Sequence, residues 1–213
     1  MGLERVLLIR HGQTDWNVQG RWQGDLPVGL NTEGYEQARS LAQHLRARPI
    51  RTIVSSDLPR ALDTAAALGT VLGIPANPDI RLREFAMGVF QGNTRPEIEA
   101  RYAAEWAAFR ADYWDYVIPG GESRRDLQNR VFVAWEELVA TAPGPEAALV
   151  SHGGSIRVLL MRLFPNDDQV QHTHIDNTSV TTVEKTENGW QLAELNRVDH
   201  LGPALDEEGE ASA

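Results

Sequence analysis

The stretch Leu7–Asn17 reads LLIRHGQTDWN, and it changes abruptly from apolar to polar residues. Its apolar beginning is typical of a short buried β-strand, which stops at Arg10 and His11. Gly12 follows and gives the backbone conformational freedom where the strand ends. The same pattern returns late in the chain, where the apolar residues 147–150 precede the run SHGG. The sequence therefore predicts two strands whose carboxyl ends carry polar groups.

A third strand candidate lies between these two, at residues 52–54. It runs into Ser55, Ser56 and Asp57, and Arg60 lies one helical turn further on. Helices are expected between the strands, and strands that alternate with helices form a mainly parallel sheet. Buried strands that end in polar groups are typical of an open α/β sheet whose ligand binds beyond the strand ends. The predicted fold is a three-layer α/β/α sandwich.

The remaining elements follow from hydrophobic periodicity and turn residues. Helical spacing predicts helices at residues 32–47, 58–72, 122–139 and 154–164, and one or two helices within residues 92–116. Residues 20–31 are expected to form a loop over the site, residues 75–78 a turn, and residues 79–82 a short extended segment. Residues 179–183 and 190–195 predict an antiparallel pair, which gives the mainly parallel central sheet one antiparallel edge strand.

Length and composition limit the function classes. The 213 residues fit a single domain over residues 1–201, and the acidic and small residues 202–213 predict a flexible tail. A formal net charge of −10 argues against binding to nucleic acid or to an anionic membrane. The chain has no cysteine for disulfides or thiolate metal sites, and no apolar run approaches the ~20 residues that span a bilayer. We expect a cytoplasmic protein.

Four side chains at the predicted strand ends predict a cationic pocket, namely Arg10, His11, Arg60 and His152. Guanidinium groups offer paired donors that match phosphate oxygens, and the helix N-terminus after Gly153 would add backbone N–H groups. A neutral imidazole among such donors can attack phosphorus, because covalent catalysis divides one difficult displacement into two. A dianionic phosphoryl group is therefore the predicted ligand.

A carboxyl group for proton transfer is available in Glu84, within the run LREFAMG. It could protonate a leaving oxygen and later take a proton from water. Taken alone, this glutamate could equally be a solvated carboxylate paired with Arg81 or Arg83.

Five blocks of sequence resemble the histidine phosphatase superfamily, also called the phosphoglycerate mutase-like family. They are RHGQTDWN, SSDLPRALDTA, LREFAMGVFQG, PGGES and VSHGGSIR, in that order within residues 3–163. One RHG triplet would be a weak signal, whereas five ordered blocks that each carry the polar residue of the family are specific. The resemblance implies the phosphoglycerate mutase-like version of the predicted fold.

The resemblance also implies roles for the residues of these blocks. His11 would become a phosphohistidine, and Glu84 would be the proton donor. Arg10, Arg60 and His152 would hold the phosphoryl group.

Three further residues are predicted to bind substrate. Asn17 matches a family asparagine that touches the phosphoryl group, and Gln23 matches a polar residue near the leaving group in the phosphatase branch. Gly153 stands at the predicted helix N-terminus. The resemblance implies no metal and no cofactor, since cations and N–H donors neutralise the charge that magnesium neutralises in other phosphoryl-transfer enzymes.

The connection between the glutamate block and the PGGES block favours a phosphatase. Family mutases carry a long insertion there, which helps to enclose the bisphosphate and exclude water, whereas here only residues 85–119 intervene. The ending NRVDHLG is also similar to that of the metal-independent phosphoserine phosphatases. That group has a histidine where this chain has Met87, which argues against phosphoserine as the substrate.

The sequence therefore predicts a metal-independent phosphomonoesterase whose partner is a small-molecule phosphate ester. The alternative enzyme is a 2,3-bisphosphoglycerate-dependent phosphoglycerate mutase. The alternative from another class is a phospho-ligand binding module without catalysis. The family also suggests a homodimer.

Other residues are weaker candidates. His172, His174 and Asp176 could suggest a metal site, but three ligands from one short segment without a glutamate base make a poor hydrolase motif. The aromatic residues 102–116 are expected to lie mostly in the core. One or two of Tyr102, Phe109 and Trp114 are expected at the substrate. A second anionic group could contact Arg21, Arg110, Arg124 or Arg157, although most arginines are simply solvated.

Overall fold

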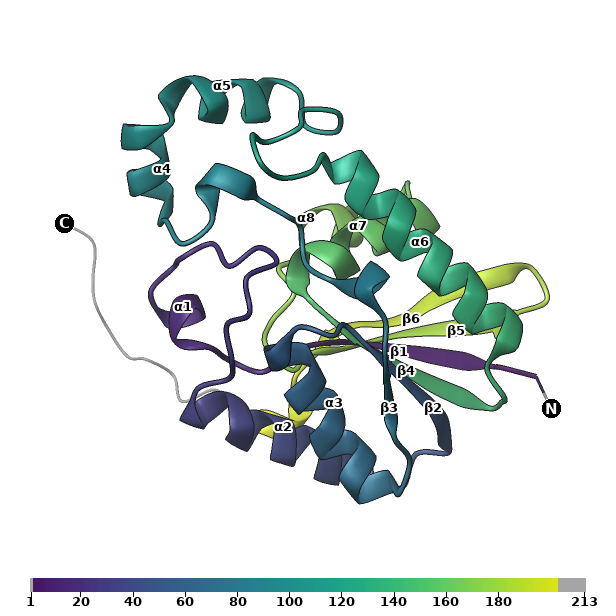
Figure 1. The fold of residues 1–213 in the computed structure, drawn as a ribbon. Coiled ribbons are helices and arrows are strands. Elements are labelled where there is room, and N and C mark those ends of the chain that lie inside the picture. Colours follow the sequence, from purple (N-terminus) through teal and green to yellow (C-terminus); the bar gives the residue numbers. More distant parts are fainter. Residues whose placement is uncertain (1, 203–213) are drawn as a thin grey trace.

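One six-stranded sheet forms the centre of the molecule, in the order β3-β2-β4-β1-β5-β6 (Figure 1). The computed structural model describes residues 2–202. The strands are β1 (Arg5–Arg10), β2 (Ile50–Ser55), β3 (Ala76–Pro78), β4 (Glu146–Ser151), β5 (Val180–Thr186) and β6 (Gly189–Arg197). Because β1, β2, β3 and β4 are parallel and β6 pairs antiparallel with β5, only β5 runs against the other strands. The mainly parallel sheet is confirmed, and its reversed strand lies one place in from the edge.

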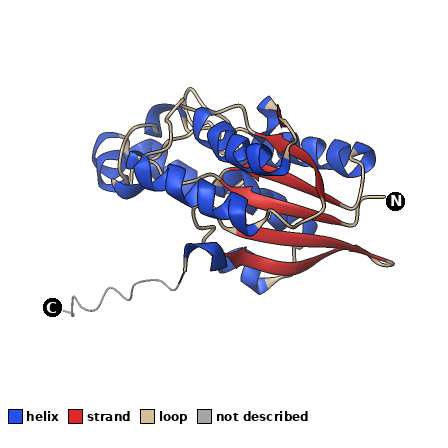
Figure 2. Cartoon of the chain, turned by 90° about the horizontal axis from the view of Figure 1, so that it is seen from below, coloured by secondary structure: helices blue, strands red, loops and turns tan. Residues whose placement is uncertain are grey.

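Helices cover both faces of this sheet (Figures 1 and 2). On one face lie α2 (Thr32–His44) and α3 (Pro59–Leu72), and on the other lie α6 (Arg124–Thr141) and α7 (Gly153–Leu163). The shorter helices are α1 (Asp15–Val18), α4 (Arg95–Arg101), α5 (Ala103–Ala111) and α8 (Asp168–His172), with 3₁₀ turns at Ile80–Leu82, Gly88–Phe90 and Asp199–Leu201. The predicted three-layer α/β/α sandwich is confirmed.

The apolar run of β1 is continuous because both faces of this strand are buried. Val6 and Leu8 belong to the core between the sheet and α6 and α7. Leu7 and Ile9 belong to the core between the sheet and α2 and α3. All four side chains are at most 1% exposed, as is usual for a central parallel strand covered by helices on both sides.

The structure differs from the sequence predictions around residues 75–82. The predicted turn contains the short strand β3, and the predicted extended segment begins a 3₁₀ turn at Ile80. The Asp79 side chain accepts a hydrogen bond from the backbone N–H of Arg81 at 2.8 Å, which ends the extended conformation. The prediction was wrong here because this capping contact outweighs the local strand pattern. The predicted tail falls outside the described residues, apart from Gly202.

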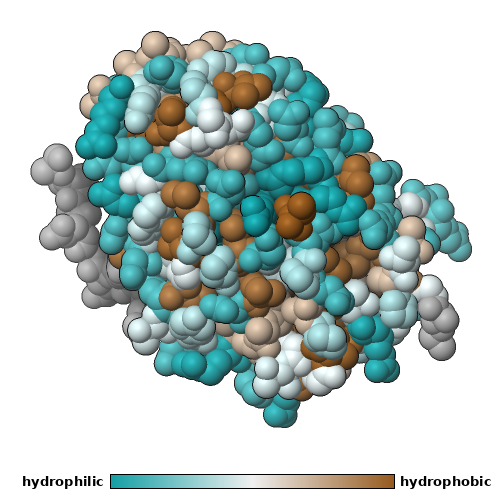
Figure 3. All heavy atoms as spheres, viewed as in Figure 1, coloured by the Kyte–Doolittle hydropathy of each residue, from teal (hydrophilic) through white to brown (hydrophobic). Residues whose placement is uncertain are grey.

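Residues 85–123, which contain α4 and α5, form a cap beyond the carboxyl ends of the parallel strands (Figure 1). Trp22, from the loop that follows α1, packs against Phe90, Trp106 and Phe109 of the cap with ring centroids 5.6–6.2 Å apart. This aromatic cluster joins the cap to the loop predicted over the site. The hydrophobic residues visible in Figure 3 are scattered among hydrophilic ones. Within residues 2–202, no helix combines the length and apolar character needed to cross a membrane.

Candidate active site

A cavity of about 490 Å³ lies between the ends of the parallel strands and the cap. It is lined by Arg10, His11, Asn17, Arg21, Trp22, Gln23, Gly24, Arg60, Glu84, Phe85, Met87, Tyr113, Arg124, Gly154 and Arg157. Most of the side chains predicted at the site are therefore brought together from separate parts of the sequence. His152 and Gly153 do not line the cavity, and the adjoining Gly154 does.

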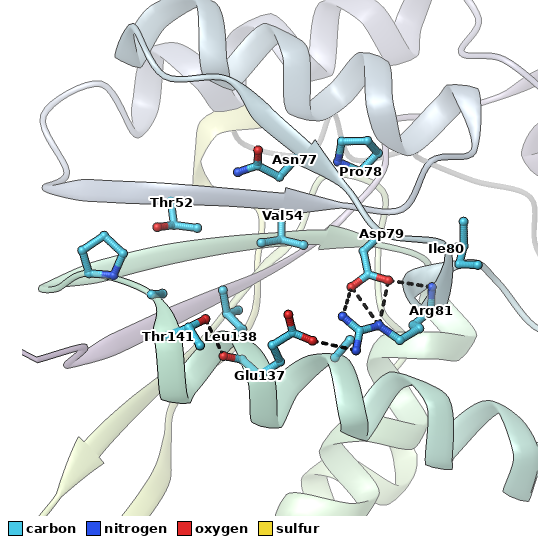
Figure 4. A pocket seen from close by; sticks show the side chains of 13 residues that line it. Thr52, Val54, Asn77, Pro78, Asp79, Ile80, Arg81, Glu137, Leu138 and Thr141 are labelled. Carbon is cyan, nitrogen blue, oxygen red and sulfur yellow. Dashed lines mark hydrogen bonds and ion pairs between the residues drawn. The ribbon is translucent and has the colours of Figure 1, made fainter.

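A larger cavity of about 590 Å³ lies between α6 and the strands β2 and β3 (Figure 4). Its charged side chains satisfy one another, because Arg81 contacts Asp79 at 2.6 Å and Glu137 at 2.8 Å. None of the residues predicted for catalysis lines it. The smaller cavity at the strand ends is the candidate active site.

The imidazole of His11 is held in one tautomer at the end of β1. Its Nδ1 lies 2.7 Å from the carbonyl oxygen of Gly12, which can only accept a hydrogen bond, so Nδ1 carries the hydrogen and Nε2 carries the lone pair. Burial lowers the pKa of His11 well below its ordinary value, and the nearby Arg60 and Arg10 lower it further. His11 is therefore a neutral imidazole with Nε2 free of a proton.

Gly12 allows the close packing that fixes this imidazole. Its N–H donates to Oγ1 of Thr64 at 3.0 Å, and a Cβ at this position would lie 2.5 Å from the carbonyl oxygen of Gly34. Any larger residue would push α2 away from the end of β1. The glycine of the RHG triplet is thus explained by the approach of α2.

Arg60 is fully buried near the start of α3 and connects His11 to the overlying loop. Its Nε donates to Nε2 of His11 at 3.3 Å. Its other nitrogens donate to the carbonyl oxygens of Leu26 at 2.8 Å and Gly24 at 2.7 Å. Burial lowers the pKa of Arg60 to about 10, so the guanidinium stays charged at neutral pH.

Arg10 and His152 each present a polar atom with no partner among residues 2–202. These buried atoms are Nε of Arg10 and Nδ1 of His152. Burial lowers the pKa of Arg10, and the negative charge of Glu84 opposes this effect. Burial also lowers the pKa of His152 well below its ordinary value, and the charges of Arg60 and His11 lower it further. Buried polar atoms normally have partners, so such unpaired atoms beside a cationic cavity are suited to a polar ligand.

His152 lies beside His11 at the N-terminus of α7. The two ring centroids are 5.1 Å apart, and Nε2 of His152 lies 2.8 Å from Oγ of Ser56. Ser56 thereby fixes the second histidine, a role that the sequence pattern does not predict. The signal that could have indicated it was its position in the block SSDLPRALDTA.

Glu84 is placed by two helices. Its carboxylate accepts hydrogen bonds from the N–H groups of Gly154 at 3.0 Å and Ser155 at 3.1 Å, at the start of α7. The N-terminus of a helix is a favourable place for a negative charge. The backbone carbonyl of Glu84 accepts from Arg130 of α6 at 2.8 Å.

The position of the Glu84 carboxylate requires a residue without a Cβ at position 154, and that residue is Gly154. A Cβ on Gly154 would lie 2.4 Å from Oε1 of Glu84, whereas a Cβ on Gly153 would meet only Arg10, at 3.5 Å. The sequence pattern predicts Gly153, the first glycine of the SHGG run, as a substrate-binding residue. In the structure, the second glycine of this run, Gly154, contacts Glu84 and lines the cavity.

Asn17 and Gln23 lie at the wall formed by α1 and the following loop. Oδ1 of Asn17 accepts from the N–H of Thr14 at 3.1 Å, so the Nδ2 group remains as its donor toward the cavity. Gln23 is 8% exposed, and its buried Oε1 has no partner within the described part of the chain.

Some of the weaker candidate residues line the cavity, and others lie away from it. Tyr102, Phe109 and Trp114 do not line the cavity, and Tyr113 does. The periodicity of an aromatic segment could not show this, because residue 113 follows the end of α5. Arg110 also lies away from the cavity, whereas Arg21, Arg124 and Arg157 line it.

The three residues considered as a metal site do not form one. His174 contacts Asp176 at 3.9 Å and Arg10 at 3.4 Å. Within residues 2–202 there is no group of three His, Cys, Asp or Glu side chains that could hold a metal ion.

Comparison with known proteins identifies the family. The family model of the histidine phosphatase superfamily, branch 1, matches residues 6–198. Glucosyl-3-phosphoglycerate phosphatase of Mycolicibacterium vanbaalenii is 41% identical over 171 residues, which are 77% of this chain and 76% of that protein. Probable phosphoglycerate mutase GpmB of Salmonella typhi is 31% identical over 210 residues, which are 95% and 98% of the two chains.

Solved structures agree with this result. The structure of a mycobacterial glucosyl-3-phosphoglycerate phosphatase in complex with VO3 superposes with a TM-score of 0.81 at 35% identity, covering 91% of this chain and 99% of the other. The phosphoglycerate mutase-like fold implied by the five sequence blocks is confirmed. The chain belongs to the histidine phosphatase superfamily, branch 1.

Proposed function

We propose that this protein hydrolyses small phosphate monoesters through a phosphohistidine on His11, with Glu84 as the proton donor and without a metal ion. That the chain is a phosphoric monoester hydrolase follows from its family and from the phosphatases among its relatives. The part that is proposed is the role of each residue in the reaction. The observation that carries it is the neutral, oriented Nε2 of His11 at a cavity that also contains Arg10 and Arg60.

The first step transfers the phosphoryl group to the enzyme. Arg10, Arg60 and the Nδ2 group of Asn17 bind the phosphoryl oxygens, and the guanidinium charges stabilise the transition state. Nε2 of His11 attacks phosphorus while the ester P–O bond breaks. Glu84, in its protonated form, gives its proton to the leaving oxygen, and the alcohol departs.

The second step regenerates the enzyme. The carboxylate of Glu84 takes a proton from water as the water oxygen attacks phosphorus. The P–N bond to His11 breaks, inorganic phosphate is released, and the imidazole returns to its neutral form. The partner of Nδ1, the carbonyl oxygen of Gly12, keeps the ring oriented through both steps.

Relatives suggest the first substrate to test. Glucosyl-3-phosphoglycerate, named for the phosphatase relatives at 41% identity, is the leading candidate ester. A 2,3-bisphosphoglycerate-dependent mutase is the second candidate function, because a relative that matches 95% of the chain is named a probable phosphoglycerate mutase. A cytoplasmic location, a single domain and a homodimer stay predictions.

The experiment that tests the proposed function measures phosphate release from a panel of esters in excess chelator, with the His11→Ala variant alongside. The panel includes 3-phosphoglycerate, glucosyl-3-phosphoglycerate, sugar phosphates, phosphoserine and p-nitrophenyl phosphate, and conversion of 3-phosphoglycerate to 2-phosphoglycerate is measured with added 2,3-bisphosphoglycerate. We expect hydrolysis that survives chelation and is lost in the variant. Near wild-type turnover in the variant would refute the phosphohistidine, and isomerisation that requires 2,3-bisphosphoglycerate without phosphate release would identify the mutase.

A further inference from the structure

Two arginines of the cavity have no carboxylate partner among residues 2–202. Arg124, at the start of α6, and Arg157, on α7, both line the cavity, and neither forms a salt bridge in the described part of the chain. Arg21, by contrast, donates to Glu97 at 2.8 Å and to the carbonyl oxygen of Gly92 at 2.7 Å. The charge of Arg21 is therefore neutralised within the protein, and the charges of Arg124 and Arg157 are not.

Arg124 is held in place by aromatic rings. Its guanidinium carbon lies 4.0 Å from the ring centroid of Phe109 and 3.9 Å from that of Tyr113. Nη1 also donates to the carbonyl oxygen of Tyr113 at 2.7 Å. Stacking and this hydrogen bond fix the guanidinium while leaving further N–H groups for a ligand.

Arg157 is fixed by the backbone and lies close to Arg124. Its Nη2 donates to the carbonyl oxygen of Gln171, which leaves its other donors available. Burial lowers the pKa of Arg124, and the charge of Arg157 lowers it further. Two neighbouring cations in a partly buried place repel each other, and an anion placed between them relieves the repulsion.

This pair lies on the side of the cavity where the leaving group must be. The Arg124 guanidinium carbon is 5.7 Å from the ring centroid of Phe85, the residue next to the proton donor Glu84. Arg157 lies three residues after Gly154, whose N–H donates to Glu84, so these two residues share a face of α7. The proton donor must contact the ester oxygen of the leaving group.

We infer that Arg124 and Arg157 bind a second anionic group, on the alcohol part of the substrate. The inference rests on the proposed function, and it defines the substrate class as phosphate monoesters whose alcohol carries a carboxylate or a further phosphate. Arg10 and Arg60 bind the phosphoryl group that is transferred, and the second arginine pair selects the alcohol.

Matched esters test this inference. Racemic 3-phosphoglycerate and racemic glycerol 3-phosphate differ only by a carboxylate in place of a hydroxymethyl group, and glycerol 1,3-bisphosphate carries a second phosphate ester at that position. We expect kcat/KM to be roughly 10- to 100-fold higher for an anionic ester than for glycerol 3-phosphate, as for a hydrogen bond to a charged group. The better of the two anionic esters identifies the group that is bound.

The variants Arg157→Gln and Arg124→Gln should lower kcat/KM more for the anionic ester than for glycerol 3-phosphate, and Arg157→Lys should restore part of the lost preference. Arg110→Ala is the control, because Arg110 is an exposed residue of the cap outside the cavity. Equal activity of the wild type on neutral and anionic esters, or equal loss on all esters in the variants, would overturn the inference.

A binding measurement separates this inference from the proposed function. Calorimetry of the same esters with the His11→Ala protein reads the second anionic site without turnover. If an anionic ester binds more tightly than glycerol 3-phosphate, and the double variant His11→Ala/Arg157→Gln loses this difference, the second anionic site is supported. Absence of hydrolysis of every ester by the wild type would refute the proposed function but not this site. Equal affinities for all three esters would refute the site.

Discussion

Nε of Arg60 donates to Nε2 of His11 over 3.3 Å, so a guanidinium contacts the atom that is proposed to attack phosphorus. The same arginine holds the loop at Gly24 and Leu26 through two shorter hydrogen bonds. One buried side chain therefore contacts the proposed nucleophile and fixes the wall of the cavity, and its charge is proposed to stabilise the transferred group.

Arg60→Lys should lower kcat/KM by about 10²–10³-fold, similar to the loss of a transition-state donor. A lysine ammonium is a point charge and cannot contact Gly24, Leu26 and His11 together as the planar guanidinium does. Steady-state kinetics with p-nitrophenyl phosphate measures the loss. Arg39→Lys is the control, because Arg39 is an exposed residue of α2 that pairs with Glu36. Activity of Arg60→Lys within threefold of the wild type would contradict the assigned role.

Gly154→Ala should displace the Glu84 carboxylate, since the new Cβ would lie 2.4 Å from Oε1. We expect turnover of alkyl phosphates to fall by about 10²–10⁴-fold, as for removal of a general acid. The loss should be much smaller for p-nitrophenyl phosphate, whose leaving group needs no proton.

Gly153→Ala is the matched control for this change, because its Cβ would meet Arg10 at an ordinary contact distance of 3.5 Å. Equal effects of the two alanines, or equal slowing of alkyl and phenolic esters in Gly154→Ala, would argue against proton donation by Glu84.

The free energy of unfolding should fall as the pH is lowered from about 6.5 to about 4. Burial lowers the pKa of His200 to about 4, and the charge of His44 contributes to this shift. The carboxylate of Asp199 raises the pKa and opposes part of the shift. Burial also lowers the pKa of His11 and of His152. The unfolded chain therefore binds more protons than the folded one in this range, so stability rises with pH through it and levels off above pH 6.5.

Urea denaturation at pH 4.5, 5.5 and 7.0 measures this dependence. His200→Asn keeps a hydrogen-bond donor toward Thr178, which lies 2.9 Å from Nε2 of His200, but cannot titrate. Its stability should fall less steeply with decreasing pH than that of the wild type. An identical slope in both proteins would show that His200 does not contribute.

Arg130→Ala should reduce both stability and turnover. Arg130 pairs with Glu122 at 2.6 Å, and it donates to three backbone carbonyls, including that of Glu84. Its removal leaves these partly buried acceptors unpaired, at a cost of about 2–4 kcal/mol in the free energy of unfolding. Arg125→Ala, on the same helix, removes an exposed pair with Asp115 and should change stability little. Equal denaturation midpoints for the two variants would contradict this prediction.

The central strands were predictable because each is marked in the sequence by a short apolar run that ends at a polar residue. The apolar runs of β1, β2 and β4 stop at polar residues, and Arg10, His11, Arg60 and Gly154, at or shortly after those ends, line the cavity. Strand β3 was missed because three residues followed by Asp79 offer no periodicity. The place of β5 depends on pairing with β1, which a single sequence does not reveal.

The cavity was predictable at the end formed by the strands and much less at the end formed by the cap. Arg10, His11 and Arg60 each stand in a motif at a strand end. The aromatic residues of the cap lie on short helices joined by Tyr102, so no single period decides which of them faces the cavity. Tyr113 could be assigned only from the structure.

The two ends of the cavity are built from different parts of the chain, so part of the wall around the leaving group can change without a change in the residues at the strand ends. The residues proposed to act on phosphorus belong to the sheet ends and the starts of α3 and α7, next to the two cores of the molecule. The cap is one continuous segment, residues 85–123, which an exchange of one gene segment can replace as a unit. Grafting the corresponding segment of a relative into this chain should replace the cavity wall formed by Phe85, Met87 and Tyr113, while Arg124, Arg157 and the reaction on phosphorus stay the same.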